Sequence, residues 1–367
     1  MLFYDFANLL PILIIIIVCL RLGLIPLWLS FFLGLFAFTP FFLNYVLFSP
    51  SYMPDQSQYF NLGQNIRSFV SDDSESFSVT IATWMLAFIP LPYIETIQSL
   101  GFFNRFMVTV LIIWLYSSKN LRGWPLLFIL FYPSLLLYSS LALRDTLVFI
   151  FMILAVIFFI ENRRLLALLF SIPLMLIKFQ NFFLIIVFFL AHLYFSRDSF
   201  IYRYRFILPI ITIAALAPYM MLLIEILDVS RFNMFIDDGG NRGDYAHVSS
   251  IEGFVIIALQ SAPYFLMKPL PWEASNLMQL IQSFENIFIL IFLGFMFLKT
   301  SKINKQITIK WFVYLLVAFG IYGLVVYNFG TAVRYKFPFI LIVIIGMAHE
   351  LYLKHGKLIL NNKGSKL

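Results

Sequence analysis

The sequence predicts an all-α protein, a polytopic transmembrane helical bundle. Hydrophobic residues make up 62% of the 367 residues, and charged residues only 12%. Soluble domains carry roughly 25% charged residues, so this chain has too few to cover a water-facing surface of its size. Its apolar stretches repeatedly reach about 20 residues, which is the length that crosses a bilayer as a helix.

The basic residues are distributed along the chain in the way that sets the orientation of a membrane protein. The net charge is +7, but the lysines and arginines fall in short clusters between apolar stretches. This pattern is typical of cytoplasmic loops and argues against nucleic-acid binding. The single cysteine, Cys19, excludes an intrachain disulfide and a cysteine-based metal site.

The basic clusters predict the topology. By the positive-inside rule the clusters near 119–122, 161–164, 197–205 and 299–310 face the cytoplasm. We therefore expect a single transmembrane domain over residues 1–353, followed by a basic cytoplasmic tail over 354–367.

The remaining connections then face outward, including two long loops at about 49–100 and 228–250. If the apolar segments at about 79–96 and 251–267 crossed the membrane, a lysine-rich loop would lie outside. We therefore predict both as re-entrant or interfacial helices on the outer side. About eleven crossings are left, with the N-terminus outside and the C-terminus inside.

One outer junction carries two charges. In "YSSLALRDTLVFIF", Arg144 and Asp145 separate two apolar runs that are each long enough to cross. A charge inside a membrane helix is costly, so such residues usually lie at an edge or in a wet cavity. Two interpretations stay open: a short turn in which Asp145 caps the next helix, or an anion site formed by Arg144.

The first outer loop offers a candidate base. In "SPSYMPDQSQYFNLGQNIRS", Asp55 follows Pro54, and the spacing predicts a helix with Asp55 as N-cap and Tyr59 one turn later. The carboxylate is then either only a cap beside an interfacial tyrosine, or a general base at the mouth of a cavity.

Further polar residues gather on the side that should be poor in lysine and arginine. Each single cation also fits a simple interface residue whose amine extends toward water. Loop 228–250 is rich in glycine and charge, which suits a mobile lid, and its Asp237–Asp238 pair is a weak cation site. The candidate binding residues are Tyr59, Arg144, Lys178, Gln180, Arg231, Lys268, Trp272, Glu285, Asn328, Arg334 and Lys336.

Fixed cations at an outer membrane cavity suit the phosphate or diphosphate of a lipid carrier. A neighbouring carboxylate supplies the base for an attacking hydroxyl, and we take Asp55, Asp145 and Glu273 as the catalytic candidates. These are the parts that a lipid-linked sugar transferase needs. The sequence contains no zinc motif, Walker loop or nucleophile elbow, and we predict no cofactor and no metal.

Several segments resemble a known group. "PDQSQYFNLGQNIRS", "FYPSLLLYSSLALRDTLVFIF" and "PLMLIKFQNFFLIIVFFL" resemble, in this order, integral-membrane glycosyltransferases of the GT-C type. "KPLPWEASNLMQLIQSFENIF" and "NFGTAVRYKFPFILIVI" resemble the bacterial O-antigen and exopolysaccharide repeat-unit polymerases. The resemblance covers about residues 50–345.

The resemblance implies sugar transfer from an undecaprenyl-linked donor on the outer leaflet. Asp55 would match the first-loop acid, Asp145 the second-loop acid, and Arg144 and Arg334 the cations that face phosphate. The chain departs from the pattern because its first loop offers one aspartate rather than an acidic pair. It also lacks the large soluble C-terminal domain of oligosaccharyltransferases, and loop 228–250 is shorter than the arginine-rich loops of polymerases.

The sequence therefore predicts a polymerase that joins undecaprenyl-diphosphate-linked oligosaccharide repeat units. We expect it in the bacterial inner membrane, with its active site facing the periplasm. A GT-C transferase that moves one sugar from a polyprenyl phosphate is the alternative enzyme, and a lipid-linked glycan transporter or flippase is the alternative of another class. The expected partners are the polyprenyl-linked donor and acceptor, membrane lipid and a chain-length regulator.

Overall fold

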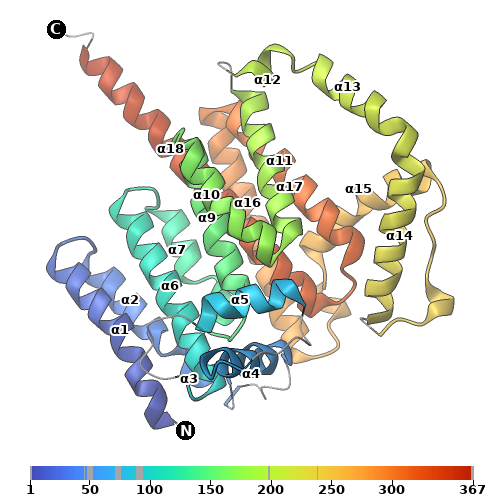
Figure 1. Ribbon diagram of the computed structural model, residues 1–367. Coiled ribbons are helices and arrows are strands. Elements are labelled where there is room, and N and C mark those ends of the chain that lie inside the picture. Colours follow the sequence, from blue (N-terminus) through green and yellow to red (C-terminus); the bar gives the residue numbers. More distant parts are fainter. Residues whose placement is uncertain are drawn as a thin grey trace. The chain divides into compact units, whose positions relative to one another are not determined.

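Helices form every regular element that the structure describes (Figure 1), which confirms the all-α fold class. The computed structural model describes residues 2–44, 46–47, 53–70, 76–87, 94–196, 199–237 and 239–364. Within them, four helices are long and apolar enough to cross a membrane: α6 (Ile97–Ser117), α16 (Leu277–Ile303), α17 (Lys305–Val325) and residues Phe329–Leu353 of α18. The count of eleven crossings stays a prediction.

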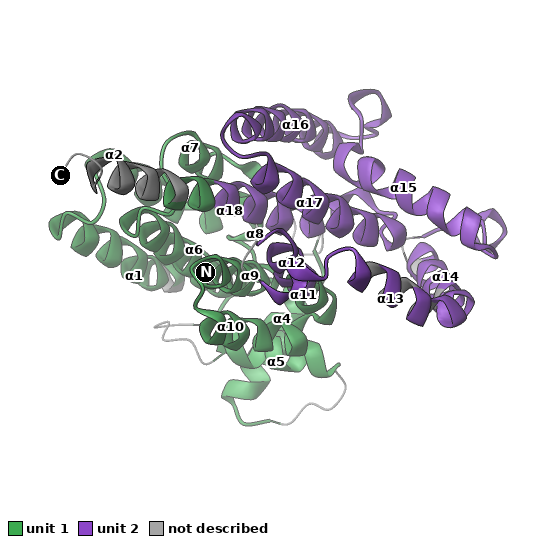
Figure 2. Ribbon diagram, turned by 90° about the horizontal axis from the view of Figure 1, so that it is seen from above, with its two compact units in different colours: residues 1–185, 348–367 green, residues 186–347 purple. Residues whose placement is uncertain are grey.

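The chain divides into two compact units (Figure 2), and each is described by itself. Unit 1 comprises residues 1–185 and 348–367, and unit 2 comprises residues 186–347. In addition to α6, unit 1 contains α1 (Leu2–Arg21), α2 (Leu27–Ala37), α3 (Thr39–Leu43), α4 (Asp55–Arg67), α5 (Phe77–Ala87), α7 (Trp124–Leu130), α8 (Pro133–Tyr138), α9 (Asp145–Ile160) and α10 (Arg164–Ile177).

Unit 2 contains α16 and α17 and most of the later helices. Two helices, α11 (Phe179–Phe195) and α18 (Phe329–Gly364), have residues in both units. The other elements of unit 2 are α12 (Phe200–Arg203), α13 (Ile207–Leu216), η2 (Ala217–Tyr219), α14 (Met220–Asp237), η3 (Arg242–Asp244), α15 (Ile251–Met267) and η4 (Pro271–Glu273).

Helix α9 lies at the centre of unit 1, where it packs against α10 and α6. Its sequence, "DTLVFIFMILAVIFFI", is apolar on every face after the first turn, and most of its side chains are buried. A helix without a polar face needs neighbours or lipid all round. Other close pairs of this unit include α1 with α6 and α2, α4 with α5, and α5 with α10.

The apolar run before Arg144 differs from the single crossing that we predicted. It forms two short helices, α7 and α8, which meet at Tyr132–Pro133. Proline has no backbone N–H and disfavours helical dihedral angles at the residue before it, so the helix stops there and restarts. Neither piece is long enough to cross a bilayer.

In unit 2, α15 packs along α17, and α16 packs on the same helix. Aromatic side chains fill the contact between α15 and α17. The ring of Phe265 lies 5.5 Å from that of Phe319 and 6.2 Å from that of Tyr322. Pairs of aromatic rings at such distances add to the stability that burial supplies.

The predicted outer loops contain more helix than we expected. The segment 49–100 holds α4, α5 and the start of α6, and residues 88–93 of the predicted interfacial helix lie outside the described residues. At 11 residues, α5 is about 16 Å long, which is too short for a hydrocarbon core of about 30 Å. The loop predicted from 228 begins later, because α14 continues to Asp237.

Helix α15 has the bounds predicted for the second interfacial segment. Its 17 residues lie at the lower limit of the length that crosses a bilayer. The side chain of Asp237, residue Asp238 and the side chains of the predicted tail 354–367 lie outside the described part, so no structural statement is made of them.

Candidate functional site

The turn that carries Arg144 and Asp145 is held in place by buried polar side chains of unit 1. Asn104 of α6 donates hydrogen bonds to the carbonyl oxygens of Leu141 (2.7 Å) and Leu143 (2.8 Å). Buried backbone groups need such partners where water is excluded. The turn between α8 and α9 is therefore a fixed internal structure rather than a loose connection.

Helix α4 is fastened to the same turn by a residue that the sequence did not single out. The Oε1 atom of Gln56 accepts a hydrogen bond from the backbone N–H of Ala142 at 3.1 Å. Its amide also exchanges two hydrogen bonds with Asn44, at 3.0 and 3.1 Å. The start of α4, with Asp55, therefore lies beside the turn that carries Arg144.

The prediction that Asp55 caps α4 is wrong. Pro54 takes the N-cap position with φ −59° and ψ −28°, and this residue makes no side-chain cap hydrogen bond. Because Pro54 already has helical dihedral angles, Asp55 becomes the first helical residue. Its carboxylate is partly exposed, whereas Tyr59, one turn later, is buried.

Asp145 and Lys178 form a buried ion pair. The Lys178 amine lies 3.5 Å from Asp145 Oδ1, and the two side chains are only 9% and 2% exposed. Lys178 therefore does not extend to the surface as an isolated interface lysine. The alternative in which Asp145 caps α9 is also wrong, since Arg144 is the N-cap and no side-chain cap bond forms.

Arg144 is the cation of this group that keeps donors available. Its Nη1 atom donates to Ser78 Oγ of α5 and to the carbonyl oxygen of Ile177 at the end of α10, both at 3.2 Å. Within the described residues, its Nε and Nη2 atoms donate to no protein acceptor. The side chain is half-buried, so the guanidinium is anchored on one side and can receive an anion on the other.

The neighbouring "KFQN" segment is divided between surface and interior. Gln180, a predicted binding residue, is exposed, whereas Asn181 is buried and contacts Met152 Sδ at 3.0 Å. We therefore assign Gln180 no contact within the Arg144 group.

Unit 2 contains a second buried group around Lys336 of α18. Its amine donates to Asn286 Oδ1 and, at 3.3 Å, to the carbonyl oxygen of Leu266. Glu285 of α16 is also buried and interacts electrostatically with Lys336. Ionisable residues this far inside apolar helices are costly and are usually functional.

Asn286 connects this group to the turn after α15. Its Nδ2 atom donates to the carbonyl oxygens of Met267 (3.1 Å) and Lys268 (2.9 Å). In the same turn, Lys268 forms an ion pair with Glu273, and Glu273 Oε2 accepts from the backbone N–H of Leu270 at 3.0 Å. Glu273, predicted as catalytic, thus stabilises the turn.

The remaining predicted residues of unit 2 lie at several places. Trp272 is 79% exposed, and Arg334 is half-buried in the second turn of α18. Asn328 precedes α18, and its Oδ1 atom accepts the N–H of Gly330 at 2.8 Å. Asn328 also lines an open pocket of about 410 Å³.

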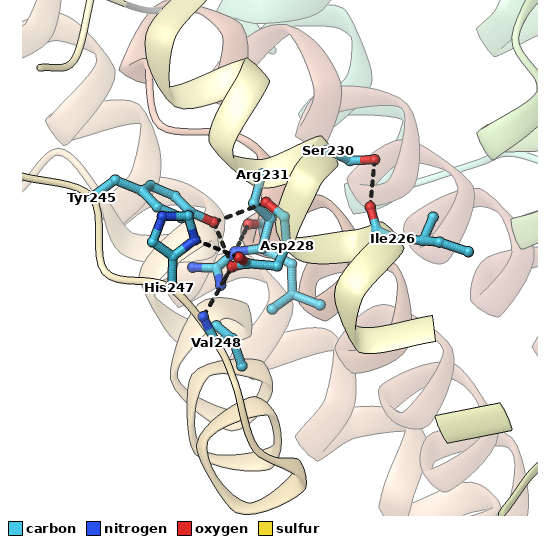
Figure 3. A network of polar contacts seen from close by, with 8 residues as sticks. Ile226, Asp228, Ser230, Arg231, Tyr245, His247 and Val248 are labelled. Atoms are coloured by element: carbon cyan, nitrogen blue, oxygen red, sulfur yellow. Dashed lines mark hydrogen bonds and ion pairs between the residues drawn. The ribbon is translucent and has the colours of Figure 1, made fainter. Parts of the chain in front are cut away.

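Arg231 belongs to a polar network that centres on Asp228 of α14 (Figure 3). The Asp228 carboxylate accepts from the Tyr245 hydroxyl (2.8 Å) and the Val248 N–H (3.0 Å), and it lies 2.7 Å from His247 Nδ1. Arg231 lies 3.9 Å from the carboxylate and donates to the carbonyl oxygen of Leu324 at 2.9 Å. This network fastens the segment after η3 to α14.

The contacts around Asp228 change the pKa values of Asp228 and Tyr245. Burial alone would raise the pKa of Asp228, but the hydrogen bonds from His247, Val248 and Tyr245 outweigh it and lower the pKa. The pKa of the Tyr245 hydroxyl is raised, first by burial and then by its hydrogen bond to Asp228. Asp228 is therefore an ionised acceptor that orients the His247 ring.

The sequence did not single out Gln56, Asn104, Asp228, His247 or Asn286. Each of them has a hydrogen-bond partner that lies at least 19 positions away in the chain. A polar residue inside an apolar helix, such as Asn104 in "GFFNRFMV" or Asn286 in "SFENIFIL", is the one signal that was available.

The structure thus joins Arg144, Asp145 and Lys178 in unit 1, and Glu285 and Lys336 in unit 2. The shared cavity predicted for Asp55, Arg144, Lys178 and Arg334 includes residues of both units, so it stays a prediction.

No group of three or more His, Cys, Asp or Glu side chains in the described part could hold a metal ion. Comparison of the chain with protein-family models, curated proteins and solved structures gave no match.

Proposed function

We propose that the protein is a GT-C-like membrane glycosyltransferase that polymerises lipid-linked oligosaccharide repeat units at the outer face of a bacterial inner membrane. The observation that carries the proposal is the fixed turn of unit 1. It holds the half-buried Arg144 with its Nε and Nη2 donors available, next to the buried pair of Asp145 and Lys178. An arginine in this setting suits the diphosphate of a polyprenyl carrier, which forms bidentate hydrogen bonds with guanidinium.

In the proposed reaction, a hydroxyl of the acceptor sugar attacks the anomeric carbon of the donor glycan. The new carbon–oxygen bond forms as the bond from that carbon to the diphosphate oxygen breaks. The electron pair leaves with the polyprenyl diphosphate, and Arg144 stabilises the developing charge. Asp55, at the partly exposed start of α4, accepts the proton of the hydroxyl.

The other predicted residues have supporting roles in this proposal. Lys178 neutralises Asp145, so this pair positions the start of α9 and leaves the net positive charge to Arg144. Arg334 is a second cation toward the carrier phosphate. About eleven crossings, with the outer loops in the periplasm, complete the proposed arrangement.

Substitution of the cations tests the proposal in cells that lack their own copy of the protein. Arg144→Ala and Arg334→Ala should each leave the protein in the membrane fraction at the normal level. Glycan ladders on a gel should shorten to one or a few repeat units, because the leaving diphosphate loses its charge partner. Ser78→Ala is the matched control, since it removes one anchor of Arg144 but keeps the cation, and it should give the normal ladder.

A normal ladder in both arginine variants, at normal protein level, would contradict this mechanism. A shortened ladder in Ser78→Ala alone would also contradict the mechanism. It would mean that the hydrogen bond from Arg144 to Ser78 matters more than the charge of Arg144.

A transporter or flippase is the second candidate, and one observation favours it. Lys310, near the start of α17, is buried, and its amine lies 3.0 Å from His192 Nδ1. This pair is on the side predicted as cytoplasmic. Together with Lys336 and Glu285, unit 2 has buried ionisable groups toward both ends of its helices, as proton and ion pathways do.

A further inference from the structure

The pocket of unit 2 has the composition of a site for a neutral, hydroxylated ring. Three of the residues that line its volume of about 410 Å³ are aromatic: Phe235, Tyr327 and Phe329. Gln279 and Asn328 add two side-chain amides, and none of the lining residues that the structure describes carries a charge. The volume lies within the range of about 300–1,000 Å³ that small-molecule sites occupy, and a few polar groups among apolar ones are typical of such sites.

The pocket lies where several outer segments meet. Phe235 comes from the last turn of α14, Gln279 from the first turn of α16, and Asn328 and Phe329 from the start of α18. Each of these helix ends adjoins a connection that the sequence predicts to face outward. A ligand from that side therefore reaches the pocket without crossing the apolar part of the bundle.

The side-chain NH₂ group of Gln279 is available as a hydrogen-bond donor in the pocket. Gln279 Oε1 accepts from the backbone N–H (2.8 Å) and the hydroxyl (2.9 Å) of Ser275, which fixes the orientation of the amide. Among the described residues, the NH₂ group of Gln279 donates to none.

Ring packing and Gly240 determine the position of Phe235 in the pocket. The rings of Phe235 and Tyr327 lie 5.2 Å apart at 74°, and Phe235 also lies 5.5 Å from Tyr245 of the Asp228 network. A Cβ atom at Gly240 would overlap the Phe235 ring, whereas one at Gly243 would meet nothing within 4 Å. Gly240 therefore permits the position that Phe235 occupies in the pocket.

We infer that this pocket binds one pyranose residue of a glycan. The C–H face of a pyranose is apolar and packs on aromatic rings, while one of its hydroxyls accepts a hydrogen bond from the NH₂ group of Gln279. The described lining residues are uncharged, which suits a sugar and disfavours a phosphate, because a phosphate would need cations. The inference rests on the proposed function for the class of ligand, and it adds a glycan subsite in unit 2.

Ligand-observed NMR on the detergent-purified full chain tests the inference, with methyl glycosides of glucose, galactose, mannose and N-acetylglucosamine as probes. At least one probe should show saturation transfer to its ring protons. Phe235→Ala, Gln279→Ala and Gly240→Ala should each weaken its binding at least tenfold. Gly243→Ala and Phe284→Ala, an exposed phenylalanine of α16 outside the pocket, should bind as the wild type does.

Glycan ladders from the same variants separate this inference from the proposed function. If no probe binds, or if the pocket variants bind as well as the controls, the subsite is refuted even where the wild type makes polymer. If a probe binds and the pocket variants lose it, but deletion of the protein leaves the ladder unchanged, the subsite stands and polymerisation is refuted.

Discussion

Asp145 and Lys178 show what a single buried ion pair costs and contributes. Removing two charges from water is expensive, and their mutual attraction offsets this only when both stay in place. The pair joins the first residue of α9 to the residue that follows α10. Loss of either partner therefore removes this ion pair from a buried charge next to the turn that carries Arg144.

We predict that Asp145→Asn and Lys178→Met each lower the free energy of unfolding by about 3–5 kcal/mol. The double variant should recover a large part of this loss, because no charge is then left unpaired. Thermal unfolding of the detergent-purified variants measures the coupling between the two substitutions.

The pair of Arg163 and Glu161 is the matched control. Its nitrogen–oxygen distance is also 3.5 Å, but its side chains are 61% and 22% exposed. Solvent-exposed pairs couple by about 0–1 kcal/mol. Equal coupling in the two pairs would mean that Asp145 and Lys178 are not buried as described.

At the scale of elements, the turn between α8 and α9 depends on a close approach of α6. A Cβ atom at Gly101 of α6 would overlap the carbonyl oxygen of Ser140. Neighbouring Asn104 then reaches the carbonyl oxygens of Leu141 and Leu143. The glycine and the asparagine together place this turn against the helix.

Gly101→Ala should therefore lower the free energy of unfolding by about 1–3 kcal/mol, the usual cost of overpacking a closely packed site. Gly34→Ala of α2 provides the control, because its added Cβ meets nothing within 4 Å. Alanine favours helix over glycine, so the control should unfold at the same or a higher temperature. If the two variants unfold alike, α6 does not contact the turn in this way.

Helix boundaries show which local signals could be read from the sequence. The bounds of α15 follow from a serine N-cap and from the proline-rich turn after it, and both are visible in "SSIEGFVIIALQSAPYFLMKPLP". Pro133 also marks the division of the run before Arg144 into α7 and α8, but our prediction followed the apolar length of the run and treated it as one crossing. Asp55 failed as a cap because Pro54 itself adopted helical dihedral angles.

At the scale of the whole molecule, composition predicted the helical class, and apolar length predicted that helices suited to a membrane would be present. The partners of the polar residues could not be predicted. Lys178 pairs with Asp145, which lies 33 positions earlier, and Gln56 accepts a hydrogen bond from Ala142, which lies 86 positions later. Such pairings depend on how the helices pack. A single sequence contains the polar residues but not the packing that brings them together.

The central claim is that one catalytic event joins two lipid-linked glycans and releases one carrier diphosphate. The most direct measurement reconstitutes the purified protein in liposomes with undecaprenyl-diphosphate-linked repeat units and analyses both glycan length and released carrier. We predict a ladder of products, with one undecaprenyl diphosphate released for each new linkage. Addition of only one sugar, or movement of the lipid between leaflets without a new glycosidic bond, would contradict it.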